Sequence, residues 1–158
     1  MTDGGELVED TSSLAESILE QIGDAVIYAD DKGTITRWNY AAATLFGYSA
    51  AEALGQNLDL IIPEHLRAAH WRGFEAAMTN GVMKLQGRPT VTRATHQTGR
   101  RLYVEMTFAL VKGQAGGAAH GAVAVAREVT RRIEEQRADA HAMDAAKRES
   151  DLDQVALT

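Results

Sequence analysis

Cysteine is absent from this 158-residue sequence. Without thiolates the chain cannot form disulfides, a Cys-ligated zinc site, an iron–sulfur cluster or a Cys-ligated haem. The absence also fits a reducing compartment, where structural disulfides are rare. Every site that depends on a cysteine is therefore excluded.

Long apolar runs and long runs of like charge are missing as well. No segment approaches the roughly 20 apolar residues that a membrane-spanning helix needs. The acidic residues 1–6 lack the basic-then-apolar order of a signal peptide. We therefore expect a soluble, cytoplasmic chain without a membrane partner. A net charge of −6 without a long run of like charge indicates that nucleic acid is not a partner.

Motifs of common enzymes are also lacking. The sequence contains no Gly-x-Gly-x-x-Gly, no Walker loop and no plausible Ser/His/Asp grouping. His65 and His120 have no partners at the spacing of a zinc site. We therefore predict that the chain is not an enzyme.

The composition, with 45% hydrophobic residues, is sufficient for one ordered domain with extensions. We expect a disordered tail over 1–11 and a flanking helix over 12–23, in which Leu14, Ile18 and Ile22 recur at helical spacing. The domain should follow over 24–130. A C-terminal helix and tail should occupy 131–158, since the sequence from Glu128 to about Glu149 lacks Gly and Pro.

Within the domain, two runs of strand are separated by helices. Gly33 in the Lys32-Gly33 turn favours a hairpin, Ser49 and Glu52 form a capping box, and the stretch from Leu102 to Val111 alternates apolar and polar residues. This order favours an α+β fold with a five-stranded antiparallel sheet and helices on one face. The expected strands are 25–30, 35–38, 86–95, 102–111 and 119–127, and the expected helices are 39–46, one from 49, and 64–80.

Several short segments of the chain resemble the PAS family of sensor domains. They are Asp24–Asp30, Trp38-Asn39, Leu45–Ser49 and Arg127–Thr130. The resemblance extends from Glu20 to Glu135. It implies the PAS fold and a sensory role in signal transduction.

His70 extends this resemblance to the haem-binding members of the family. It lies on the apolar face of the helix over 64–80, between Leu66 and Phe74, and a neutral imidazole is a good axial ligand for haem iron. In haem-binding PAS gas sensors the proximal histidine lies on this helix, after a proline-containing start and an Arg-x-x-His step. Arg67-Ala-Ala-His70 matches that step. The resemblance implies haem b with His70 as its iron ligand, and Leu66, Phe74 and Met78 beside it. The alternative is a histidine that only packs at the sheet surface.

The same resemblance suggests residues for the other side of the pocket. Met106 and Phe108 match positions above the iron, and a methionine thioether can be a second iron ligand; the alternative for Met106 is ordinary core packing. Arg88 corresponds to a strand arginine that bonds bound oxygen or a propionate, or it is a solvated surface residue. Trp38 packs, lines the pocket mouth or contacts a flavin, as in FAD-binding PAS domains.

Three functions therefore remain open. The first is a haem sensor of O2, CO, NO or redox state. The second is a cofactor-free PAS module for dimerisation or interaction, and the third is an FAD-binding redox sensor; the absence of cysteine excludes the covalent photochemistry of LOV domains. We expect a homodimer held by the flanking helices, with a downstream signalling protein or output domain that the sequence does not identify. The approximate heptad residues of the C-terminal helix are Val129, Ile133, Gln136, Ala140 and Met143.

Overall fold

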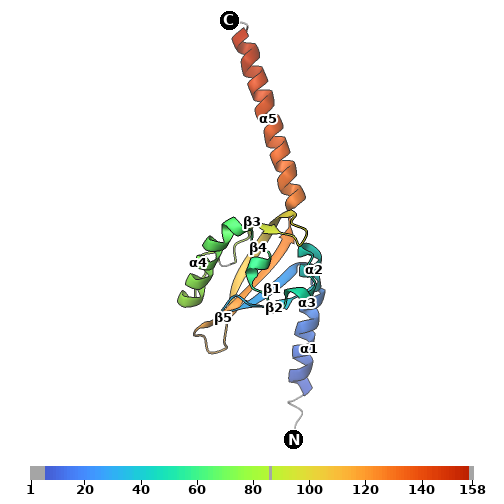
Figure 1. Cartoon of the computed structure of the whole chain (residues 1–158), viewed down its shortest axis with the longest axis vertical. Coiled ribbons are helices and arrows are strands. Elements are labelled where there is room, and N and C mark those ends of the chain that lie inside the picture. The colour runs from blue at the N-terminus through green and yellow to red at the C-terminus, as the bar shows by residue number, and fades with distance from the viewer. Residues whose placement is uncertain (1–5, 86, 157–158) are drawn as a thin grey trace. The chain divides into compact units, whose positions relative to one another are not determined.

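The computed structural model describes residues 6–85 and 87–156, and the chain divides into two compact units, one ending at Glu128 and one beginning at Val129 (Figure 1). The second unit consists of one helix, α5 (Thr130–Ala156). The elements of the first unit are α1 (Glu6–Gln21), β1 (Ala25–Asp30), β2 (Ile35–Trp38), α2 (Tyr40–Phe46), α3 (Ala50–Ala53), the 3₁₀ helix η1 (Leu58–Leu60), α4 (Glu64–Asn80), β3 (Thr90–Thr95), β4 (Arg101–Lys112) and β5 (Ala119–Glu128).

The five strands form one antiparallel sheet in the order β2-β1-β5-β4-β3. The expected α+β fold with a five-stranded antiparallel sheet is therefore confirmed. The apolar core lies on one face of the sheet, where Leu102, Val104 and Met106 of β4 are buried against residues of α2 and α3, and Phe108 packs against the same cluster. The alternation of β4 thus places Met106 and Phe108 on the same face, as predicted.

Local sequence signals explain several element ends. In the β1–β2 turn, the Asp30 carboxylate accepts hydrogen bonds from the backbone amides of Lys32 and Thr34, and Gly33 adopts a left-handed φ of 81°. The capping box at α3 is present in full: the Glu52 amide donates to the Ser49 hydroxyl at 3.2 Å, and the Ser49 amide donates to the Glu52 carboxylate at 2.7 Å. These short-range patterns therefore correctly predicted the hairpin and the helix start.

Several boundaries differ from the sequence-based expectation, and α5 continues to Ala156 rather than to about Glu149. Helix α1 already begins at Glu6, within the segment expected as a disordered tail over 1–11. It ends at Gln21, not at residue 23. Strand β3 begins at Thr90 rather than at 86, because Gly87 has φ 70° and Pro89 lacks an amide donor. Residues 1–5 and 86 lie outside the described residues.

The Asn39 side chain connects the flanking helix α1 with the sheet. Its amide nitrogen donates to the carbonyl oxygens of Leu19 and Asp24, at 2.8 and 3.0 Å. Its oxygen accepts from the backbone amides of Val26 and Ala42, both at 2.9 Å. These four bonds use the full capacity of a side-chain amide. Asn39 is 4% exposed and is the only polar residue classed as buried in the described part of the chain.

Replacing Asn39 with Ala should lower the free energy of unfolding by about 2 to 4 kcal/mol, since each buried polar group left unpaired costs about 1 to 3 kcal/mol. The matched control is Asn57→Ala, which removes a single exposed capping bond to the Asp59 amide and should cost about 1 kcal/mol or less. Urea unfolding of the full chain measures both values. Equal losses for the two variants would contradict the role assigned to Asn39.

Candidate functional site

Helix α4 buries its inner side chains only in part. Leu66, His70, Phe74 and Met78 recur at helical spacing and are all half-buried, and Ala77 is the only fully buried residue between Glu64 and Asn80. By contrast, Ala42 and Phe46 of α2 and Ala53 of α3 have no exposed surface. Helix α2 contacts β1 and β5, α3 contacts β2, and α4 contacts β5 (Figure 1). The side of the sheet beneath α4 is therefore less completely packed.

His70 lies within an aromatic cluster on this helix. Its ring centroid is 5.1 Å from that of Trp71, at an interplanar angle of 80°, and 6.1 Å from that of Phe74, at 28°. Its Nδ1 atom is buried and has no hydrogen-bond partner among the described residues. Burial lowers the pKa of the His70 imidazole below its ordinary value, and the Asp59 carboxylate opposes this effect. The imidazole is therefore neutral at neutral pH and keeps one nitrogen unpaired.

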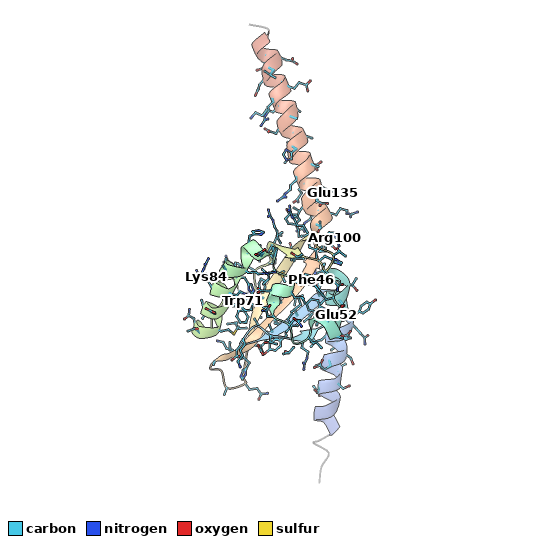
Figure 2. All side chains as sticks on the ribbon, viewed as in Figure 1. Phe46, Glu52, Trp71, Lys84, Arg100 and Glu135 are labelled. Atoms are coloured by element: carbon cyan, nitrogen blue, oxygen red, sulfur yellow. The ribbon has the colours of Figure 1, made fainter. Side chains whose placement is uncertain are left out.

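A second face of α4 is fixed by polar bonds. The Trp71 indole N–H donates to Asp59 Oδ1 at 2.8 Å, and Arg67 donates to the carbonyl oxygens of Ile62 and Asp59 at 3.0 and 3.3 Å. The Trp71 ring also lies where a Cβ atom on Gly33 would be, so it packs directly on the β1–β2 turn. Figure 2 shows Trp71 between α4 and the strands.

Small side chains on β5 face the same core as Met106 and Phe108. The register pairs Met106 with Ala126, Phe108 with Ala124 and Leu110 with Ala122. Ala126 belongs to the core cluster and Ala124 packs against it. Because alanine projects little from a strand, this part of the sheet surface leaves more room than a surface of larger apolar residues. The alanines of β5 and the half-buried side chains of α4 are therefore the least tightly packed apolar residues near His70.

The structure places the predicted site residues in three different environments. Leu66, His70, Phe74 and Met78 share the inner face of α4, and Met106 and Phe108 share the core face of β4. Arg88 is exposed and precedes β3, so the expectation that it begins this strand is wrong.

Trp38 packs in the core, which is one of the alternatives that the sequence left open. It is 5% exposed, packs on Phe46 with ring centroids 5.5 Å apart, and its indole N–H donates to the Tyr48 carbonyl oxygen at 2.9 Å. Its location in the core is determined by contacts with α2 and the following loop, which the local sequence pattern does not reveal.

Sequence reasoning missed Asp59 and Trp71. The available signal was weak: Trp71 follows Arg67 by four residues, so both lie on one face of a helix. Nothing in the spacing identifies Asp59 as the acceptor that they share.

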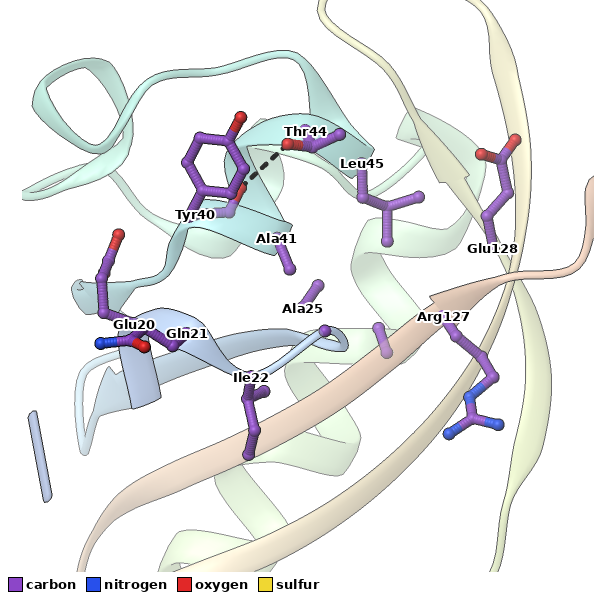
Figure 3. Close-up of a pocket in the computed structure, with 12 residues that line it drawn as sticks. Glu20, Gln21, Ile22, Ala25, Tyr40, Ala41, Thr44, Leu45, Arg127 and Glu128 are labelled. Carbon is purple, nitrogen blue, oxygen red and sulfur yellow. Dashed lines mark hydrogen bonds between the residues drawn. The ribbon is translucent and has the colours of Figure 1, made fainter. Parts of the chain in front are cut away.

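A separate open groove of about 820 Å³ lies between the end of α1, α2 and the strands β1 and β5 (Figure 3). Ala25, Ala126 and Leu45 contribute apolar surface, while Glu20, Arg127 and Glu128 provide charge. Arg127 is paired with Asp24 at 2.8 Å and Glu128 with Arg100 at 3.1 Å, so two of these three charges are already engaged. No residue of α4 or β4 lines this groove, which therefore lies apart from His70.

Two kinds of feature are absent from the residues that the structure describes. No group of three or more His, Asp or Glu side chains gathers there as a metal site. No helix within 6–85 and 87–156 has the length and apolar character needed to cross a membrane.

Comparison with known proteins agrees with the fold. The chain is 46% identical over 54 residues to the sensor protein FixL of Bradyrhizobium diazoefficiens, covering 34% of this chain and 11% of FixL. It is 28% identical over 99 residues to the oxygen sensor protein DosP of Escherichia coli, covering 63% of this chain and 12% of DosP. The chain therefore spans only about a tenth of the length of these two relatives.

Solved structures show the same architecture. A PAS domain from Colwellia psychrerythraea superposes with a TM-score of 0.66 at 22% identity, covering 77% of this chain and 99% of that domain. An RNA-binding light-oxygen-voltage receptor superposes with a TM-score of 0.65 at 25% identity, covering 90% of this chain and 40% of the receptor. The family model described as PAS fold matches residues 14–129, which is most of the sequence, and the chain therefore belongs to the PAS family.

Proposed function

We propose that this chain is a sensory PAS module that binds haem b through His70 and responds to a diatomic gas or to redox state. The observation that carries the proposal is the buried, unpaired Nδ1 of a half-buried histidine on α4. A buried polar atom normally has a hydrogen-bond partner, so its absence calls for an explanation. A role of the imidazole in binding a ligand would explain the unpaired nitrogen.

The residues around His70 suit this group. The lowered pKa keeps the imidazole neutral, as iron ligation requires. Leu66, Phe74 and Met78 would cover the haem from α4, and Met106 and Phe108 would cover it from β4. One histidine is enough to hold haem iron, so a cluster of metal ligands is not needed. When bound, the haem supplies an iron centre that binds a diatomic gas or changes oxidation state.

The side chains around the haem would then determine which gas or redox signal is detected and how the protein responds to it. Apolar walls would limit access of water, and the Met106 thioether would be the candidate for a second protein ligand to the iron. The similarity to a protein named as an oxygen sensor supports oxygen as one signal. A change at His70 would bias the position of α4, and flanking helices α1 and α5 would transmit it to an output partner.

The flanking helix α1 also supports a homodimer. Its apolar stripe remains exposed, with Leu14 at 59%, Ile18 at 51% and Ile22 at 41%. Exposed apolar stripes commonly mark interfaces, and twofold pairing is the commonest arrangement of soluble oligomers. The proposed partner of this stripe is therefore a second copy of the chain.

Purified full chain mixed with hemin should develop a Soret band at a ratio of one haem per chain. His70→Ala should weaken hemin binding by more than about 100-fold, since losing even a group that orients a metal ligand costs about 10- to 100-fold. His120→Ala, which alters an exposed histidine, should bind normally.

An unchanged Soret band and stoichiometry in His70→Ala would contradict the proposed ligand. Flavin absorption bands from the chain purified from cells would instead support the FAD sensor. A chain that binds neither group would support the cofactor-free interaction module.

Without haem, the stability of the chain should depend on pH through His70. The folded-state pKa is lowered, so the unfolded state takes up the proton first, near its ordinary value of about 6.5. The free energy of unfolding should therefore fall as pH drops from about 7.5 to about 5, and the fall should be smaller in His70→Gln. Urea unfolding at both pH values measures this difference. Identical pH dependence in the two proteins would exclude a neutral, desolvated His70.

Ile18→Asp should weaken the dimer by at least about tenfold, because it places a charge within the apolar stripe of α1. Ser13→Asp adds the same charge off the stripe and should leave the association unchanged. Sedimentation of the full chain at tens of micromolar distinguishes the two variants. A monomeric wild-type chain under these conditions would refute the proposed pairing.

A further inference from the structure

We propose that Asp59 is the positioning residue for His70, and that it acts through the Trp71 indole. The inference rests on the proposed function only where His70 is taken as an iron ligand. The positioning itself is a property of the chain without haem.

Helix α4 presents two faces that are fixed in different ways. Leu66, His70 and Phe74 form the inner face, which is only half-buried and so is not locked by apolar packing. Arg67 and Trp71 lie on a neighbouring face and bind the segment before the helix through directional hydrogen bonds. The rotation of α4 about its axis is therefore set largely by this polar face.

Asp59 accepts hydrogen bonds from both side chains of this face, Arg67 and Trp71. Its carboxylate oxygen Oδ1 accepts the Trp71 indole N–H at 2.8 Å, and the same oxygen lies 3.8 Å from Arg67 Nε. Its backbone carbonyl accepts a further bond from Arg67 at 3.3 Å. The Asp59 amide is itself held by the Asn57 side chain at 2.8 Å, which fixes the position of η1.

Trp71 transfers this constraint to the ligand side of the helix. One side of its ring packs on Gly33. A side chain at that position would occupy the space of the indole. The Trp71 ring meets His70 edge-on at 5.1 Å and Phe74 edge-on at 5.5 Å and 76°. A ring that is bonded at one end and confined on one side can rotate little. The His70 and Phe74 rings are therefore oriented by the indole against which they pack.

The first test uses the full chain without haem. Asp59→Ala and Trp71→Phe should each shift the NMR resonance of the His70 Cε1 proton, because this proton senses the rings of Trp71 and Phe74. Asp59→Asn retains an acceptor oxygen and should preserve the wild-type resonance. Asp31→Ala removes an exposed carboxylate from the nearby turn and serves as the matched control. A His70 resonance that is unchanged in both Asp59→Ala and Trp71→Phe would overturn the proposal.

The second test uses the same variants loaded with hemin. Asp59→Ala and Trp71→Phe should release hemin about 10 to 100 times faster than wild type and broaden the Soret band, as expected when a ligand loses its orienting partner. Asp59→Asn and Asp31→Ala should behave as wild type. Wild-type release rates and spectra in both disrupted variants would overturn the positioning role.

The NMR test and the hemin test distinguish haem binding by the chain from positioning of His70 by Asp59. Failure of the wild-type chain to bind hemin would reject the proposed function, and the resonance of His70 would still decide the role of Asp59. Urea unfolding of each variant controls for general loss of structure: a shifted His70 resonance in a chain that remains cooperatively folded supports positioning.

Discussion

The Asn39 side-chain amide is the interaction on which the arrangement of this PAS domain depends. Its four hydrogen bonds join the end of α1, the start of β1 and the first turn of α2 at one buried point. The bonds to the Val26 and Ala42 amides are buried, and the bonds to the Leu19 and Asp24 carbonyl oxygens are partly buried. Since a side-chain amide has no further bonding capacity, no group in this junction can move without breaking a bond. The Asn39 side chain thereby ties the flanking helix to the sheet, and the exposed pair between Arg37 of β2 and Glu16 of α1 adds a second link at 3.1 Å.

This rigid junction contrasts with the region around α4. Near Asn39, Ala42 and Phe46 of α2 and Ala53 of α3 are fully buried in the core. At α4 the inner face is half-buried, β5 presents alanines, and the helix is held along one edge by Asp59 through Arg67 and Trp71. The proposed ligand site would therefore lie beside a helix that is not fully packed into the core. The same construction allows changes at the ligand to alter the helix while the Asn39 junction remains intact.

Sequence reasoning succeeded where short-range patterns determine structure. Pro63 and Gly81 bound α4 at Glu64 and Asn80, and alternation in β4 correctly placed Met106 and Phe108 on one face. It failed where contacts between residues far apart in the sequence determine the structure. Arg88 was assigned to a strand that begins only at Thr90. For Trp38, packing was one of several alternatives, and its contacts with Phe46 and Tyr48 appear only in the structure. The contact between Asp59 and Trp71 has no periodic signature, so the element that orients His70 could be found only in three dimensions.

Hydrogen exchange of the full chain with and without hemin tests most directly whether α4 borders a ligand site. Incompletely packed segments open more easily than core strands, and a ligand that binds the native state suppresses such opening. The account predicts that amides of α4 exchange faster than those of β4 and β5 in the free chain and become strongly protected when hemin binds. Slow exchange of α4 in the free chain, with no change on adding hemin, would contradict it.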